Sequence, residues 1–267
     1  MDEKKLLLGR VKELSEKAYF NNYVTSTNFL SASELAMFYD ITGAVGMTGK
    51  GTIFNGATYY IYGGREDADR NTICFLPEYL DAETFMATQK AEPDIIACIH
   101  ITPVNARFAD ELNHRDYLGA LMNLGIERDM TGDIMCDENE AYIYVMKEIA
   151  PIICKELIRI KHTSVKCEEV LPDECTLSNK FEEIQGSVAS ERLDVILAFV
   201  YNLSRSQASE LINAEQVFID GRTAYSGGYD LKQGSKVSVR GKGKFIYDGI
   251  KGNTRKGRLF VTARIYK

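Results

Sequence analysis

The chain has 267 residues, and a hydrophobic content of 45% is enough for the core of one large domain or of two to three small ones. It contains no run of about 18 apolar residues, which excludes a membrane span, and its N-terminus, MDEKKLLLGRVKEL, is too charged for a signal peptide. The net charge of −6 argues, at first sight, against a nucleic-acid-binding protein. We therefore expect a folded, cytoplasmic protein with no membrane partner.

Residues 1–90 are expected to form an N-terminal domain of helices and strands. Its predicted elements are a helix over residues 2–19, a helix from Ser31 to about Gly43, a loop over 46–56, and strands over 59–62 and 71–76. Ser31 and Glu34 form the capping box that begins the second helix. The glycines at 43, 46, 49 and 51 lack the Gly-Lys-Ser/Thr ending of a phosphate-binding loop, so we interpret them as hairpin glycines.

Residues 91–172 show the pattern of a second domain. The predicted elements are a strand over 95–102, a helix over 114–124, strands over 133–136 and 141–145, a helix over 147–158 and a strand over 163–170. This β-α-β-β-α-β order predicts the ferredoxin-like fold that RNA-recognition motifs share. Tyr142 and Tyr144 could stack on bases. Alternation within a half-buried strand explains them equally well, and we favour that interpretation.

The start of the helix at residue 114 carries His114, Arg115 and Asp116, which together could form a catalytic or RNA-contacting cluster. The alternative is a helix N-terminus, in which Asn113 caps the helix and Asp116 complements its dipole. Because no second base, nucleophile or metal partner can be assigned, we favour the structural interpretation and expect no catalytic residues.

The six cysteines, at positions 74, 98, 136, 154, 167 and 175, form no Cys-x-x-Cys pair. We expect reduced, mostly buried thiols. A metal site built from Cys167, Cys175 and His162 would lack an obvious fourth ligand. We therefore expect no metal, no cofactor and no small-molecule substrate.

The net charge conceals a strong division along the chain. Residues 1–180 carry 18 basic and 29 acidic side chains, whereas residues 181–267 carry 14 basic and 9 acidic ones. From Lys232 onward there are 11 basic residues, and Asp248 is the only acidic one. A basic C-terminal domain on an acidic body indicates a polyanionic ligand.

Residues 181–267 are expected to form that C-terminal domain, after a linker over 172–180. The predicted elements are a strand over 181–188, a helix capped by Ser190, a second helix begun by the capping box of Ser204 and Gln207, and strands over 236–240, 244–247 and 259–266. The second helix N-terminus presents backbone N–H groups beside Arg205 and Ser206, a combination that suits a phosphate. Its ligand is therefore expected to be a polyanion.

The candidate RNA-binding residues share a basic or hydrogen-bonding side chain at a helix start or in a strand loop. They are Arg192, Ser204, Arg205, Ser206, Gln207, Arg240, Lys242, Lys244, Arg255 and Lys256. The last two belong to the basic loop over residues 251–258, which suits an RNA backbone.

Several motifs of this region resemble those of the S-four RNA-binding domain, named after a small-subunit ribosomal protein. They are Arg192-Leu-Asp194, the segment LSRSQASELI over residues 203–212, Val217-x-Ile-Asp-Gly221 and LKQGSKVSVR over residues 231–240. Two departures stand out. Glu215 occupies a position where the family usually has glycine, and Ser235 replaces an aspartate. If the turn at Glu215 needs a positive φ, the side chain costs some backbone energy.

A wider resemblance covers nearly the whole chain. The segment His114–Ile126, Gly132-Asp-Ile134, Tyr62-Gly-Gly64, Phe75-Leu-Pro77 and the C-terminal domain are similar to those of the bacterial YlmH family. The resemblance implies an α+β protein with an N-terminal domain, a middle domain like an RNA-recognition motif and an S-four domain. It further implies ribosomal RNA, the large ribosomal subunit and tRNA as partners, in ribosome-associated quality control of obstructed peptidyl-tRNA complexes.

Two other functions remain open. Pseudouridine synthases often carry an S-four domain and place a catalytic aspartate in an Arg-Leu-Asp motif, but here Arg192-Leu-Asp194 continues as VILAFV without the expected threonine and glycine. The acidic first part of the chain could also serve as a scaffold for a protein partner. A non-catalytic RNA-binding factor of the ribosome is the leading interpretation.

Overall fold

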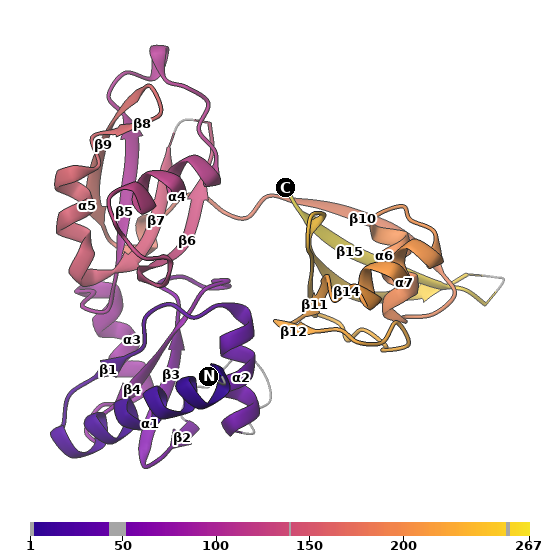
Figure 1. Cartoon of the computed structure of the whole chain (residues 1–267), viewed down its shortest axis with the longest axis horizontal. Helices are drawn as coiled ribbons and strands as arrows, with labels where there is room; N and C mark the ends of the chain where they lie inside the picture. The colour runs from indigo at the N-terminus through magenta and orange to yellow at the C-terminus, as the bar shows by residue number, and fades with distance from the viewer. Residues whose placement is uncertain (1–2, 43–51, 139, 255–256) are drawn as a thin grey trace. The chain divides into compact units, whose positions relative to one another are not determined.

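The structure of the chain is a computed structural model that describes residues 3–42, 52–138, 140–254 and 257–267. It forms two compact units, Met1–Ser178 and Asn179–Lys267 (Figure 1). Both units combine helices with β-sheets, so the predicted α+β class is confirmed. The finer division into domains over 1–90, 91–172 and 181–267 stays a prediction. In the described ranges, no helix is long and apolar enough to cross a membrane.

The first unit begins with a four-stranded antiparallel sheet in the order β1-β4-β3-β2. Its strands are β1 (Thr25–Ser26), β2 (Thr52–Phe54), β3 (Ala57–Tyr62) and β4 (Thr72–Leu76), and the helices α1 (Glu3–Asn21) and α2 (Ala32–Thr42) cover one face. The predicted capping box of α2 is confirmed. The backbone N of Ser31 donates to Glu34 Oε2 at 2.8 Å, and the backbone N of Glu34 donates to Ser31 Oγ at 3.3 Å.

Two elements of this unit differ from the prediction. β2 lies inside the segment 46–56, so the expected loop was wrong for residues 52–54. The missed signal is Asn55-Gly56, whose positive φ values of 48° and 88° form the turn of a β-hairpin. Helix α3 (Ala82–Ala91) was also missed, although Asp81 caps it by accepting a hydrogen bond from the Thr84 backbone at 2.7 Å. The glycines at 43, 46, 49 and 51 lie outside the described residues.

The second sheet of this unit has the strand order β6-β7-β5-β9-β8 with antiparallel neighbours throughout. Its elements are β5 (Ile96–Pro103), α4 (His114–Asn123), β6 (Thr131–Cys136), β7 (Ala141–Met146), α5 (Ala150–Glu156), the short β8 (Arg159–Ile160) and β9 (Thr163–Val170). The predicted ferredoxin-like arrangement is therefore confirmed. Helices α4 and α5 pack on one face, against Ile99, Ile143 and Val165.

The other face of the second sheet is covered by the first. Tyr142 and Tyr144 are only 5% and 1% exposed, and they share a hydrophobic cluster with Phe29, Tyr60 and Tyr62 of the N-terminal region. This burial favours the interpretation of the two tyrosines as half-buried strand residues and contradicts a base-stacking platform at these positions.

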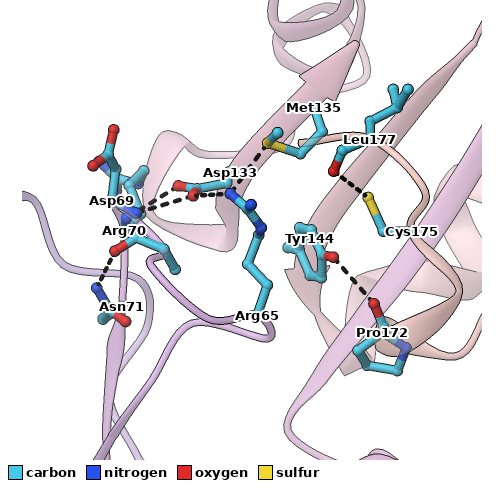
Figure 2. Close-up of polar contacts among 11 residues, drawn as sticks. Arg65, Asp69, Arg70, Asn71, Asp133, Met135, Tyr144, Pro172, Cys175 and Leu177 are labelled. Carbon is cyan, nitrogen blue, oxygen red and sulfur yellow. Dashed lines mark hydrogen bonds and ion pairs between the residues drawn. The ribbon is translucent and has the colours of Figure 1, made fainter. Parts of the chain in front are cut away.

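Polar contacts between the two sheets centre on Asp133 of β6 (Figure 2). Its carboxylate accepts hydrogen bonds from the backbone N–H groups of Asp69 and Arg70 at 2.9 and 3.0 Å, and Arg65 Nη1 lies 3.7 Å away. Burial raises the pKa of the Asp133 carboxyl above its usual value. These contacts fix the β3–β4 connection to β6.

The second unit, residues 179–267, contains a six-stranded antiparallel sheet in the order β10-β15-β14-β13-β11-β12. Its elements are β10 (Phe181–Val188), α6 (Leu193–Val200), α7 (Arg205–Asn213), β11 (Val217–Ile219), β12 (Arg222–Thr223), β13 (Lys236–Val239), β14 (Gly243–Asn253) and β15 (Leu259–Tyr266). The two helices pack on the sheet through Leu193, Ile196 and Ile212, which are buried. The predicted strands over 181–188 and 259–266 match β10 and β15, whereas β14 is longer than predicted.

Candidate nucleic-acid interface

The first helix of the candidate interface begins later than predicted. Ser190 does not cap it; Arg192 is the capping position, and the helix starts at Leu193. The backbone N–H groups of Leu193 and Asp194 donate to the carbonyl oxygens of Tyr229 and Gly227, at 2.8 and 3.2 Å. A loop some 35 residues further along the chain thus replaces the local cap, and no local sequence signal reveals this.

The second helix begins as predicted. Ser204 Oγ accepts from the Gln207 backbone N at 3.2 Å, and the Ser204 backbone N donates to Gln207 Oε1 at 2.9 Å, which completes the capping box. Ser204, Arg205, Ser206 and Gln207 are all exposed. The capping box therefore holds Arg205 and Ser206 on the solvent side of the first turn of α7.

Asp194 joins the two candidate arginines. Its Oδ1 lies 3.1 Å from Arg192 Nε, and its Oδ2 accepts from Arg192 Nη2 at 3.1 Å and from Arg205 Nη2 at 2.5 Å. The Asp194 side chain is 6% exposed, whereas those of Arg192 and Arg205 are 45% and 62% exposed. Burial of Asp194 opposes its ionisation, but the two guanidinium groups outweigh this effect and hold the pKa of the carboxyl below its usual value.

This arrangement turns two flexible side chains into a fixed pair. A guanidinium has five N–H donors, and Asp194 engages two on Arg192 and one on Arg205. The remaining donors are available to an anion, and the N-terminus of α7 adds its positive dipole end. The site therefore combines the positive charge and the N–H donors that suit a phosphate.

A second group of candidate residues lies in the turn between β13 and β14 and at the start of β14. Arg240, Lys242 and Lys244 are exposed. The backbone N of Arg240 donates to Gln216 O at 2.9 Å, and its guanidinium carbon lies 5.8 Å from the centre of the Phe218 ring. Lys242 lines a groove of about 320 Å³ together with residues of α7, including Gln207. Arg255 and Lys256 lie outside the described residues.

The two departures from the S-four pattern have structural consequences. Glu215 adopts a φ of 54°, so the turn after α7 does require the left-handed conformation in which glycine is least strained. Ser235 is buried, and the preceding Gly234 has a φ of 87°. Neither residue alters the two helices.

The remaining sequence candidates behave as structural groups. Asn113 and Asp116 form a capping box at the start of α4, and Asp116 Oδ2 lies 2.7 Å from Lys161 Nζ, so the structural interpretation of this segment is favoured. None of the six cysteines is in a disulfide; Cys74 and Cys98 are buried, and the other four are half-buried. In the part of the chain that the structure describes, no group of three or more His, Cys, Asp or Glu residues could hold a metal ion.

Sequence reasoning missed two features of this surface. One is the role of Asp194. In the sequence it is an acidic residue in the first turn of a helix, but in the structure its carboxylate binds both Arg192 and Arg205. The other is the loop between β12 and β13, where Tyr225 and Tyr229 are exposed. The only available signal was the composition Tyr-Ser-Gly-Gly-Tyr.

Comparisons with known proteins show which families and proteins the chain is similar to. A family model described as "Putative RNA-binding domain in YlmH" matches residues 96–174, and a model of the S4 domain matches residues 191–237. A curated relative, ribosome-associated protein quality control protein P2 of Bacillus subtilis (strain 168), is 27% identical over 240 residues, which cover 88% of this chain and 85% of the relative. The structure of cell division protein ylmH from Streptococcus pneumoniae is similar with a TM-score of 0.46 and 20% identity, and the match covers 66% of this chain and 95% of that one.

Proposed function

Because the chain belongs to the YlmH family, with the family's RNA-binding domain followed by an S4 domain, we propose that it is a non-catalytic factor that binds ribosomal RNA on the large ribosomal subunit. The observation that carries the proposal is the pair Arg192 and Arg205, held by one buried carboxylate on the exposed side of the basic unit. Phosphate contacts of this kind supply most of the affinity in non-specific RNA binding and fix the protein's orientation.

The role in quality control rests on the relative. The B. subtilis protein is named for ribosome-associated quality control, and its similarity spans both units of this chain. We propose that this chain also acts in ribosome-associated quality control, on large subunits that carry obstructed peptidyl-tRNA. This role would add tRNA as a second partner. It would also place the chain in the cytoplasm.

The geometry supports a binding role over a pseudouridine-synthase-like activity. A nucleophilic aspartate must reach the base that it attacks, whereas Asp194 of the Arg-Leu-Asp motif is 4% exposed and engaged by two guanidinium groups. The acidic first unit can make protein contacts in the same complex, so a scaffold role is compatible with RNA binding. A scaffold role alone does not explain why Arg192 and Arg205 are held together on the exposed surface of the second unit.

Electron microscopy of ribosomal particles recovered with the tagged chain tests the proposal. We expect large subunits with residues 181–267 in contact with ribosomal RNA, and tRNA in a subset of the particles. Recovery of small subunits alone, or contact through residues 1–178 alone, would contradict it. Mass spectrometry of ribosomal RNA and tRNA from cells that lack the chain should show no missing modification.

A further inference from the structure

The loop between β12 and β13 is an unassigned part of the surface beside the arginine pair. Residues 225–230 read Tyr-Ser-Gly-Gly-Tyr-Asp and carry two exposed aromatic side chains, with Tyr225 75% and Tyr229 44% exposed. The two rings lie within five residues of each other on the basic unit, where a nucleic-acid ligand can reach them, and an exposed aromatic ring offers a flat apolar face for stacking.

The loop is fixed to the start of α6 by its backbone. Tyr229 O and Gly227 O accept the hydrogen bonds of the first N–H groups of α6, and Asp230 pairs with Arg192 in an isolated antiparallel β-bridge. The middle of the loop, from Gly227 to Asp230, is therefore bonded to the residues that carry the candidate phosphate site. The backbone of Tyr229 is therefore held next to Arg192, and Tyr225 lies two residues before Gly227 on the same loop.

Gly227 allows the loop to approach Asp194 closely. A Cβ on Gly227 would lie 3.0 Å from Asp194 Cβ and 3.4 Å from Ile212 Cδ1, so a larger residue would force the loop or its neighbours to shift by a few tenths of an ångström. Ser226 Oγ accepts a hydrogen bond from the Gly228 backbone N at 3.2 Å, which shapes the turn. The chain thus holds two exposed aromatic rings on a close-packed and ordered turn.

The geometry points to a nucleotide site in which Tyr225 or Tyr229 stacks on an unpaired RNA base while Arg192 and Arg205 hold a neighbouring phosphate. The inference rests on the proposed RNA-binding function and deepens it, since it makes the preferred ligand a loop, bulge or unpaired end rather than a regular duplex. Proteins recognise unpaired bases by stacking them on aromatic side chains, and this contact tolerates any base. A regular duplex offers no free base face and can use only the arginines.

The test uses the full-length chain and an RNA hairpin that contains 2-aminopurine as one unpaired loop nucleotide, because stacking quenches its fluorescence. We expect quenching on binding by the wild type. Tyr225→Leu or Tyr229→Leu should lower the affinity about tenfold and remove most of the quenching. The salt dependence of binding should stay unchanged, because no charge is lost. The corresponding Phe variants keep the ring and should behave as the wild type.

Controls separate this inference from the proposed function. Tyr19→Leu removes an exposed tyrosine from α1 in the acidic unit and should have no effect. Arg192→Gln should lower affinity and flatten the salt dependence.

The outcomes distinguish the stacking site from the proposed function. If Arg192→Gln lowers the affinity while both Leu variants bind and quench like the wild type, the stacking site is refuted and the proposed RNA-binding function stands. If neither the Leu variants nor Arg192→Gln changes binding, the stacking site and the proposed RNA-binding function are both refuted. If the Leu variants lose affinity for ribosomal particles but not for the hairpin, the loop binds protein, which also overturns the inference.

Discussion

Asp194 Oδ2 lies 2.5 Å from Arg205 Nη2, and this contact links the first turn of α6 to the first turn of α7. The carboxylate is buried, the guanidinium is exposed, and Arg192 binds the same carboxylate through two hydrogen bonds. One acidic residue therefore determines where two basic side chains point. The contact also changes what charge reversal would do, because a glutamate at position 205 would face Asp194 as well as the RNA.

Asp194→Asn tests the positioning role. The variant keeps the shape of the side chain but loses two charge-assisted interactions, so we expect a loss of roughly 1–3 kcal/mol in the free energy of unfolding. RNA affinity should also fall, although the variant carries one negative charge less, because the arginines lose their fixed orientation. Denaturant melts and RNA titrations measure the two effects; a rise in affinity would show that net charge matters more than orientation.

The pH dependence of stability follows from the same carboxyl. Because its pKa is lowered in the folded chain, Asp194 stabilises the fold fully above its unfolded pKa of about 3.9. The contribution is lost as the pH falls through the folded value. The difference in unfolding free energy between the wild type and Asp194→Asn should thus be constant near neutral pH and shrink below about pH 4. A difference that grows with acidification would contradict the assigned ion pairs.

The two arginines should be coupled through Asp194. Arg192→Gln and Arg205→Gln each leave the carboxylate one partner and should destabilise the chain little. The double variant leaves a buried charge without a guanidinium, which costs about 3–5 kcal/mol when a buried pair is broken. A double-mutant cycle on the unfolding free energies measures this coupling. Additive effects would mean that Asp194 does not link the two side chains.

Glu215→Gly should stabilise the second unit. The residue has a φ of 54°, a conformation that costs most side chains about 1–2 kcal/mol, and part of this is offset by the greater freedom of glycine in the unfolded chain. We expect a gain of up to about 1 kcal/mol, measured by thermal melts of the full chain. Destabilisation would indicate that the Glu215 side chain makes a contact that outweighs its backbone strain.

Gly64→Ala tests the packing between the two sheets of the first unit. Gly64 has a φ of 84°, and an added Cβ would lie 2.5 Å from Tyr144 Cδ1, so we expect a loss of about 2 kcal/mol or more. Gly119→Ala in α4 is the matched control: its Cβ would meet nothing within 4 Å, and the helix interior should gain about 0.5–1 kcal/mol. Equal melting temperatures for the two variants would place Tyr144 away from the N-terminal sheet.

The sequence predicted those features whose cause is local. The capping boxes at Ser31 and Ser204 and the cap at Asn113 are visible in the sequence because each partner lies within three residues, and all three are present in the structure. The strand pattern of the ferredoxin-like sheet is likewise a matter of alternation along short segments. The topology of this sheet could be predicted because the β-α-β-β-α-β order of elements is typical of the ferredoxin-like fold.

The features that escaped prediction depend on contacts between distant residues. The cap of α6 comes from the carbonyl groups of Gly227 and Tyr229, and the burial of Tyr142 comes from packing against the N-terminal sheet. The candidate residues were identified from their type and exposure. Their orientation was not predictable, because Asp194 and Arg205 are 11 positions apart and meet only once both helices have packed.

The most direct test of the central claim is co-sedimentation of Arg205→Gln with purified large ribosomal subunits across a salt series. We expect weaker binding and a reduction of roughly one in the slope of log affinity against log salt, as for one lost phosphate contact. Arg10→Gln on α1, which removes the same charge from an exposed position of the acidic unit, should sediment like the wild type. If Arg205→Gln melts and sediments as the wild type at every salt concentration, the helix pair is not the RNA-binding surface.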